Sequence, residues 1–291
     1  MVNEDLIARI VKAVFAELNA DKEPEKIESV NKVTKNDEEE IAEFSNIEEQ
    51  DRLKVPMPKN EKALRSFLKS TDARIGVWRV GDRPLTGSLL KFRADHAAAV
   101  DAVFNDVSEE LVDRLGVVKI QTMVKDRDEF LTRPDLGRMI DETVRKELME
   151  KCKIKPQLQV IIADGLSSRA IEANIEDLLH ALSQGLDICG VEQGTPVFVK
   201  YGRVGVMDII GETLNAEAAI IFIGERPGLT TSESMSAYIS YKPDRANEES
   251  NRTVLSNIHR GGTPPAEAGA CIATVVKKIL DKKASGINLK D

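Results

Sequence analysis

Short apolar runs in the second half of the chain alternate with stretches of helical spacing. The runs end in glycine-containing turns and are LQVIIADG at 158–165, PVFVKYG at 196–202 and AAIIFIGERPG at 218–228. Helical patterns follow at about 169–186 and 207–214. Runs rich in Val and Ile that alternate with helices are typical of parallel strands with both faces covered. The pattern predicts an α/β domain with a Rossmann-like parallel sheet over residues 151–291.

The sheet domain is completed by weaker signals near the end of the chain. A further strand is predicted near 237–241, followed by the segment NRTVLSNIH and a final helix at about 264–282. Before the domain, residues 56–150 carry mostly helical patterns, as in KALRSFLKST and AAAVDAVFNDVSEELVDRL. We therefore expect a small helical subdomain at 56–150.

The first residues place apolar side chains on one helical stripe and charged side chains elsewhere, which predicts an amphipathic helix at 1–20. Residues 21–55 are dominated by Glu, Lys, Asn and Asp, so they bury too little surface to offset chain entropy and are interpreted as a flexible charged linker. A helix tethered in this way favours docking to another surface. The alternative is a helix folded back on its own domain.

Composition and charge limit the partners. The formal net charge is -8, and Lys and Arg are interspersed with acids, which argues against nucleic acid because phosphate binding needs clustered cations. No apolar run approaches the roughly 18 residues of a membrane span, and no signal peptide is evident. Cys152, Cys189 and Cys271 lack metal or disulfide spacing. We expect a cytoplasmic protein without a membrane or nucleic-acid partner.

The loops after the predicted strands carry the candidate chemistry. DGLSS, YGRVG and GERPG contain an aspartate, a guanidinium and a carboxylate, each beside a glycine. In open parallel sheets, ligands bind outside the carboxyl ends of the strands, so these loops are expected to face one shared cleft that holds a large ligand. The alternative for each loop alone is an ordinary turn or helix cap.

Evidence for chemistry performed by this chain itself is weak. The sequence has no G-x-G-x-x-G, P-loop, H-E-x-x-H or G-x-S-x-G motif. Asp95 and His96 are adjacent, and adjacent residues on a helix do not face each other. The two residues can therefore be interpreted either as a catalytic pair or as part of a polar helix face. His259 lies in a constrained Gly- and Pro-rich loop. With so few His and no Cys pair, we expect neither a metal site nor catalytic residues, and interpret the loops as a binding surface.

Several longer strings closely resemble the small subunit of ethanolamine ammonia-lyase. The resemblance runs from about residue 86 to 288 and is carried by LLKFRADHAAAVDAV, FLTRPDLGR, VIIADGLSSRAI, VKYGRVGVMDIIGE, IIFIGERPGLTTSESMSAY, SNIHRGGTPPAEAG and KASGIN. It implies an enzyme that converts ethanolamine to acetaldehyde and ammonia with adenosylcobalamin as cofactor. The family implies that a large subunit holds the catalytic residues, that the small subunit covers the cobalamin, and that the hetero-oligomer contains six copies of each.

The resemblance also assigns cofactor contacts to this chain. They fall on Val204 in YGRVG, Glu225 in GERPG and Val254 in NRTVLSN. Val204 is expected to pack against the macrocycle or its lower base, and Glu225 to accept hydrogen bonds from ribose hydroxyls or corrin amides. Val254 stands where better-known members have cysteine, so this position is expected to act by packing or backbone contact.

Two further functions remain open at this level. Enzymes of this family are often packaged in bacterial microcompartments, so the helix at 1–20 is a candidate docking signal for a shell or cargo partner. This role is compatible with a small subunit. A self-sufficient nucleotide or dinucleotide enzyme on a Rossmann-like sheet is the competing function, and the missing Gly-rich fingerprint counts against it.

Overall fold

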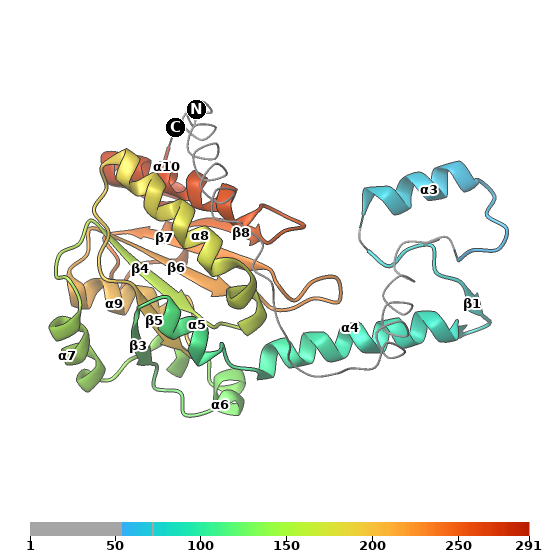
Figure 1. Cartoon of the computed structure of the whole chain (residues 1–291), viewed down its shortest axis with the longest axis horizontal. Coiled ribbons are helices and arrows are strands. Elements are labelled where there is room, and N and C mark those ends of the chain that lie inside the picture. Colours follow the sequence, from blue (N-terminus) through green and yellow to red (C-terminus); the bar gives the residue numbers. More distant parts are fainter. Residues whose placement is uncertain (1–53, 72, 291) are drawn as a thin grey trace, which may run out of the picture. The chain divides into compact units, whose positions relative to one another are not determined.

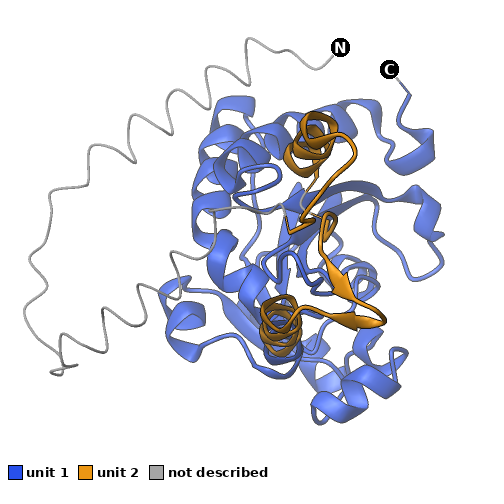
Figure 2. Ribbon diagram, turned by 90° about the vertical axis from the view of Figure 1, so that its right-hand side faces the viewer, with its two compact units in different colours: residues 1–21, 98–291 blue, residues 22–97 orange. Residues whose placement is uncertain are grey.

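The computed structural model of the protein describes residues 54–71 and 73–290. They fall into two compact units, divided between Ala97 and Ala98 and shown in separate colours in Figure 2. The predicted helix at 1–20 lies outside the described residues, as does the linker at 21–55 except for its last two positions. The predicted subdomain at 56–150 is thus divided, because its residues from Ala98 onward belong to the larger unit.

The smaller unit contains a helix, a short hairpin and the start of a second helix. These elements are α3 (Glu61–Ser70), β1 (Arg79–Val80), β2 (Arg83–Pro84) and α4 (Thr86–Phe104), which continues into the larger unit. The start of α3 is set by Asn60, whose side chain accepts a hydrogen bond from the backbone N–H of Ala63 at 3.0 Å. Arg74 forms an ion pair with Asp95 of α4 and lies over the Phe92 ring.

The larger unit is built on one six-stranded sheet in the order β3-β5-β4-β6-β7-β8 (Figure 1). Its strands are β3 (Val118–Gln121), β4 (Leu158–Ala163), β5 (Val197–Lys200), β6 (Ala218–Gly224), β7 (Met235–Tyr241) and β8 (Thr253–Ile258). Every residue of β4 and β6 is buried, as expected for central strands covered on both faces. The α/β class predicted from the sequence is confirmed.

The prediction of a parallel sheet is wrong beyond β6. Strands β3, β5, β4 and β6 are parallel, but β7 is antiparallel to β6 and β8 is antiparallel to β7. The reason is the connection. Residues 225–234 join β6 to β7 as a hairpin, whereas a parallel neighbour needs a crossover of a dozen or more residues. The sheet is therefore mixed.

Helices cover both faces of this sheet. On one face α8 (Ser168–Cys189) and α10 (Pro265–Lys282) pack on each other and on the strands, and on the other α9 (Val206–Leu214) and α7 (Glu142–Lys151) pack (Figure 1). Alternate side chains of β4 separate accordingly, Val160 and Ile162 toward α8 and Ile161 and Ala163 toward α9. We call these the α8 face and the α9 face.

Short elements fill the connections. They are α5 (Glu109–Arg114), α6 (Arg127–Thr132), η2 (Leu136–Arg138), η3 (Glu249–Asn251) and η4 (Gly286–Asn288). The strand β3 was not found from the sequence, which indicated helical structure there. It lies at the edge of the sheet, where only Ile120 of its residues is buried, so its apolar pattern is weak. Within the described ranges no helix is long and apolar enough to cross a membrane.

Candidate functional site

The loops after β4 and β5 leave the sheet toward opposite faces. After β4 the chain enters α8 on one face of the sheet and returns to β5, the neighbour of β4. After β5 it enters α9 on the other face and crosses β4 to reach β6. The two loops therefore diverge between the neighbouring strands β4 and β5. In open α/β sheets the crevice at such a switch point is the usual place for a ligand. DGLSS and YGRVG flank this crevice, as the sequence predicted.

In this protein the crevice is closed by the chain itself. Asp164 Oδ1 accepts hydrogen bonds from the backbone N–H groups of Gly165 at 2.9 Å and of Gly202 at 3.1 Å, which ties the first loop to the second. The N–H of Leu166 donates to the carbonyl oxygen of Gly224 at 3.0 Å, which ties in the third. The loops therefore meet and leave no open cleft at these contacts, and a ligand-binding surface must be sought beside them.

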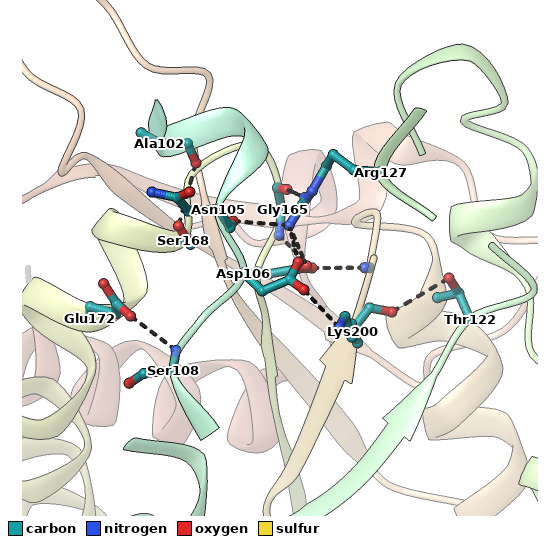
Figure 3. A network of polar contacts seen from close by, with 12 residues as sticks. Ala102, Asn105, Asp106, Ser108, Thr122, Arg127, Gly165, Ser168, Glu172 and Lys200 are labelled. Carbon is teal, nitrogen blue, oxygen red and sulfur yellow. Dashed lines mark hydrogen bonds and ion pairs between the residues drawn. The ribbon is translucent and has the colours of Figure 1, made fainter. Parts of the chain in front are cut away.

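Arg127 of α6 connects Asp164 to the residues that follow α4. Figure 3 shows Arg127 beside Asn105, Asp106 and Gly165. Its Nη2 atom lies 3.3 Å from Asp164 Oδ2, 2.9 Å from Asp106 Oδ1 and 3.1 Å from the carbonyl oxygen of Asn105. Lys200 forms a second ion pair with Asp106 at 2.8 Å. One guanidinium thus holds together segments that are distant in the sequence.

Burial dominates the electrostatics of Asp164. It raises the pKa of this carboxyl to about 6, against the opposing effects of Arg127 and of the N–H groups of Tyr201, Gly202 and Gly165. Because the folded-state pKa lies above that of an exposed aspartate, the contribution of Asp164 to stability is fully present below about pH 4 and is lost as the pH rises through about 6. At neutral pH this carboxyl is mostly ionised, and holding its charge in a buried position lowers the stability of the fold.

The loop after β5 is held in a strained conformation. Tyr201 has φ of +58°, in the left-handed region that bulky side chains rarely adopt, and its side chain is buried. Its carbonyl oxygen accepts a hydrogen bond from Thr122 Oγ1 at 3.0 Å. Arg203 stacks its guanidinium 4.1 Å above the Phe130 ring and donates its backbone N–H to the carbonyl oxygen of Gly137 at 2.8 Å. Residues of the motif FLTRPDLGR therefore hold the YGRVG loop in place through contacts with Arg203.

Glu225 begins the hairpin between β6 and β7, and its carboxylate organises that hairpin. It accepts hydrogen bonds from the hydroxyls of Ser234 and Ser236 and from the backbone N–H of Asn257. Burial alone would raise its pKa, but these hydrogen bonds and nearby His259 outweigh burial and lower it. Glu225 is therefore ionised at neutral pH, with its orientation fixed.

The three positions assigned to the cofactor share the α9 face. Val204 packs against the apolar cluster of that face. Val254 lies opposite Tyr238, which contacts the same cluster, and cross-strand partners point to one side of a sheet. Glu225 bonds to Ser236, whose partner on β6 belongs to this cluster too. However, Val254 is the second residue of β8, with 47% of its surface exposed, away from the strand-end loops.

Sequence reasoning missed the residues that support these positions. Arg127 lies 37 residues before Asp164, and no spacing rule links them. Ser234 and Ser236 had a detectable signal, because alternating serines at the start of β7 place both hydroxyls on the face of Glu225. Their role still depended on the hairpin, which the sequence did not predict.

The other candidates are not brought together as a catalytic group. Asp95 pairs with Arg74 and, at 3.9 Å, with Lys91, which fits the polar helix face that the sequence left open. His259 accepts the backbone N–H of Gly261 at Nδ1, so its Nε2 donates to Asn257 Oδ1 at 2.9 Å. Among the described residues, no group of His, Cys, Asp and Glu side chains has the arrangement of a metal site.

Comparison with known proteins gives one family. The model of the ethanolamine ammonia-lyase light chain (EutC) matches residues 61–290. The ethanolamine ammonia-lyase small subunit of Clostridium tetani is 50% identical over 86% of this chain and 85% of its own length. The small subunit of Clostridium perfringens is 44% identical over 99% of this chain and 100% of its own. The matched region contains both the loops and the α9 face, and the chain belongs to the ethanolamine ammonia-lyase light chain family.

Proposed function

We propose that this chain is the small subunit of an adenosylcobalamin-dependent ethanolamine ammonia-lyase, which converts ethanolamine to acetaldehyde and ammonia. In this proposal it forms one wall of the cofactor site at the interface with a large subunit that holds the catalytic residues. The supporting observation is that Val204, Glu225 and Val254, which come from three separate segments, share the α9 face of one sheet.

The chemistry of these positions fits the cofactor. A corrin has an apolar ring surface and amide side chains at its rim, so it needs aliphatic contacts beside hydrogen-bond acceptors. Val204 and Val254 provide the aliphatic contacts. The Glu225 carboxylate has about four acceptor positions, of which Ser234, Ser236 and Asn257 take three, which leaves one for a ribose hydroxyl or a corrin amide.

In this proposal, residues of this chain bind and orient the cofactor and exclude water from one side of it. When bound, adenosylcobalamin supplies an adenosyl radical through breakage of its cobalt–carbon bond. Glu225 is preorganised for this task because its hydrogen bonds to the hairpin fix its carboxylate before the cofactor arrives. Val254 keeps about half of its surface exposed on β8, and a macrocycle packed there would remove that apolar surface from water.

An exposed apolar surface supports a protein partner. The helix α4 carries Leu90, Phe92, Val100 and Phe104, all substantially exposed beside its polar positions. Exposed apolar side chains in this number favour cover by a partner. We assign this cover to the large subunit, in a hetero-oligomer of six copies of each chain. Packaging in a bacterial microcompartment, through a shell or cargo contact of residues 1–20, belongs to the same proposal, with the enzyme in the cytoplasm.

Reconstitution from separate chains tests the function. The isolated chain with adenosylcobalamin and ethanolamine is expected to release no ammonia, and addition of the large subunit is expected to restore release and to shift the cobalamin absorption spectrum. The large subunit with cofactor but without this chain is the matched control. Turnover by this chain alone, or full turnover by the large subunit alone, contradicts the proposal.

Substitution of Glu225 by Gln tests the cofactor contact. The change removes the charge with little change in shape, and cobalamin binding to the reconstituted complex is expected to weaken by about 1–3 kcal/mol because an acceptor is lost. The control is Glu233→Gln in the same hairpin, where the carboxylate is exposed. Binding is measured by absorption titration, with urea unfolding of both variants. An unchanged cobalamin affinity in Glu225→Gln removes this residue from the site.

A further inference from the structure

The loop at residues 201–204, part of the proposed cofactor wall, contains a strained backbone position. Tyr201 occupies the left-handed region at φ of +58°. A non-glycine residue is strained in this conformation, which persists only where the surroundings enforce it. The next residues lead directly to Val204, whose side chain packs on the α9 face. Whatever enforces the backbone of Tyr201 therefore also sets the position of Val204.

Asp164 holds the backbone of this loop. Its Oδ1 atom accepts the N–H of Gly202 at 3.1 Å, directly after the strained residue. Gly202 itself fits only because it lacks a side chain, since a Cβ there would lie 2.7 Å from the Cβ of Ala163. The strand end and the loop are thus in close contact, and the carboxylate of Asp164 joins them.

Arg127 holds both Asp164 and the side chain of Tyr201. Its guanidinium lies 4.9 Å from the centre of the Tyr201 ring and 5.2 Å from the centre of the Phe130 ring, so it lies over both aromatic side chains. It also pairs with Asp164 at 3.3 Å and with Asp106 at 2.9 Å. A lysine has no planar fork and would keep only part of these contacts.

The burial of these two charged groups leaves little surface for a direct contact with a ligand. The side chain of Asp164 is 2% exposed and that of Arg127 is 9% exposed. Buried ion pairs give little net stability, because desolvation offsets their attraction. The main effect of the pair is therefore to fix the conformation of the loop at residues 201–204.

We propose that Arg127 and Asp164 are positioning residues, which hold residues 201–204 in the conformation that presents Val204 to the cofactor. This inference rests on the proposed function. The two residues touch the loop and each other but not the cofactor, so their loss is expected to affect cofactor binding more than turnover at saturating cofactor.

The test uses Asp164→Asn in the reconstituted complex with the large subunit. Adenosylcobalamin is titrated and followed by its absorption spectrum, and KM for cofactor and kcat are measured separately. We expect the Kd and the KM for adenosylcobalamin to rise about tenfold, as for the loss of one charge-assisted hydrogen bond, with kcat changed less than about twofold. Asp177→Asn, at an exposed position on α8, is the matched control and should leave all values unchanged.

Arg127→Lys is the second variant and decides the question if Asp164→Asn does not fold. It keeps the charge but not the fork, and we expect a rise in Kd smaller than that of Asp164→Asn, with kcat preserved. A folded variant of either kind with unchanged cofactor Kd overturns the positioning role, and so does a fall in kcat with KM unchanged. If the unsubstituted complex gives no spectral change with cobalamin, the proposed function itself fails, which separates the two results.

Discussion

Replacement of Gly224 by Ala is expected to destabilise the chain by about 3 kcal/mol or more. A Cβ at this position would lie far inside van der Waals contact of the carbonyl oxygen of Ser167 and 2.8 Å from that of Asp164. Both atoms belong to the backbone where the first and third loops meet, so no side chain can rotate to make room. The free energy of unfolding of the full chain, measured in urea, checks this prediction.

Gly228→Ala is the control, because it makes the same substitution within GERPG. The nearest atom to a Cβ there is the carbonyl oxygen of Thr231 at 3.8 Å, which is ordinary contact. Its free energy of unfolding should stay within about 0.5 kcal/mol of that of the unsubstituted chain. Equal stability losses for the two variants would show that the meeting of the loops does not limit the space at Gly224.

Replacement of Arg252 by Met is expected to cost about 3–5 kcal/mol, because it leaves a buried carboxylate without its partner. Arg252 precedes β8 and pairs with Asp208 of α9 at 2.6 Å, and the two side chains are 7% and 4% exposed. The pair connects α9 to the strand that carries Val254. Unfolding in urea measures the loss, and Arg245→Met is the control. Arg245 pairs with Glu212, which lies on α9 like Asp208, but both side chains are exposed. The expected loss of stability in Arg245→Met is therefore less than about 1 kcal/mol.

The loss in Arg252→Met should depend on pH. Burial raises the pKa of Asp208, and Arg252 opposes that rise. A raised folded-state pKa means that the contribution to stability is present at low pH and is lost as the pH rises through that pKa. Without Arg252 the pKa rises further, so the destabilisation should be smallest in acid and largest at neutral pH. A loss that is independent of pH would assign the effect to packing of the arginine stem.

The central strands were predictable because their signals are local. β4 and β6 are buried on both faces, so each reads as a continuous apolar run followed by a glycine turn. The direction of β7 had no such signal. The residues of β7 are compatible with a strand of either direction, and only the hairpin at 225–234 makes it antiparallel. β3 was missed because an edge strand needs few apolar residues.

The candidate site was predictable residue by residue but not as an arrangement. The resemblance named Val204, Glu225 and Val254, and the common face of the three depends on the register of β7 with β8. The expected open cleft between the strand-end loops is instead closed, because Gly202, Gly224 and Asp164 bring the backbones into contact. A sequence records which residues follow a strand, but not how close two such loops approach.

The sequence by itself determined the α/β class, the central strands, the loops at their ends and the family, because each depends on residues close together in the chain or on motifs read in order. The tertiary structure alone decided the mixed sheet, the common face of Val204, Glu225 and Val254 and the contacts of Arg127 with Asp164 and Tyr201. These features join residues that are far apart in sequence. Their energies come from burial and from paired charges, which exist only after the chain has folded.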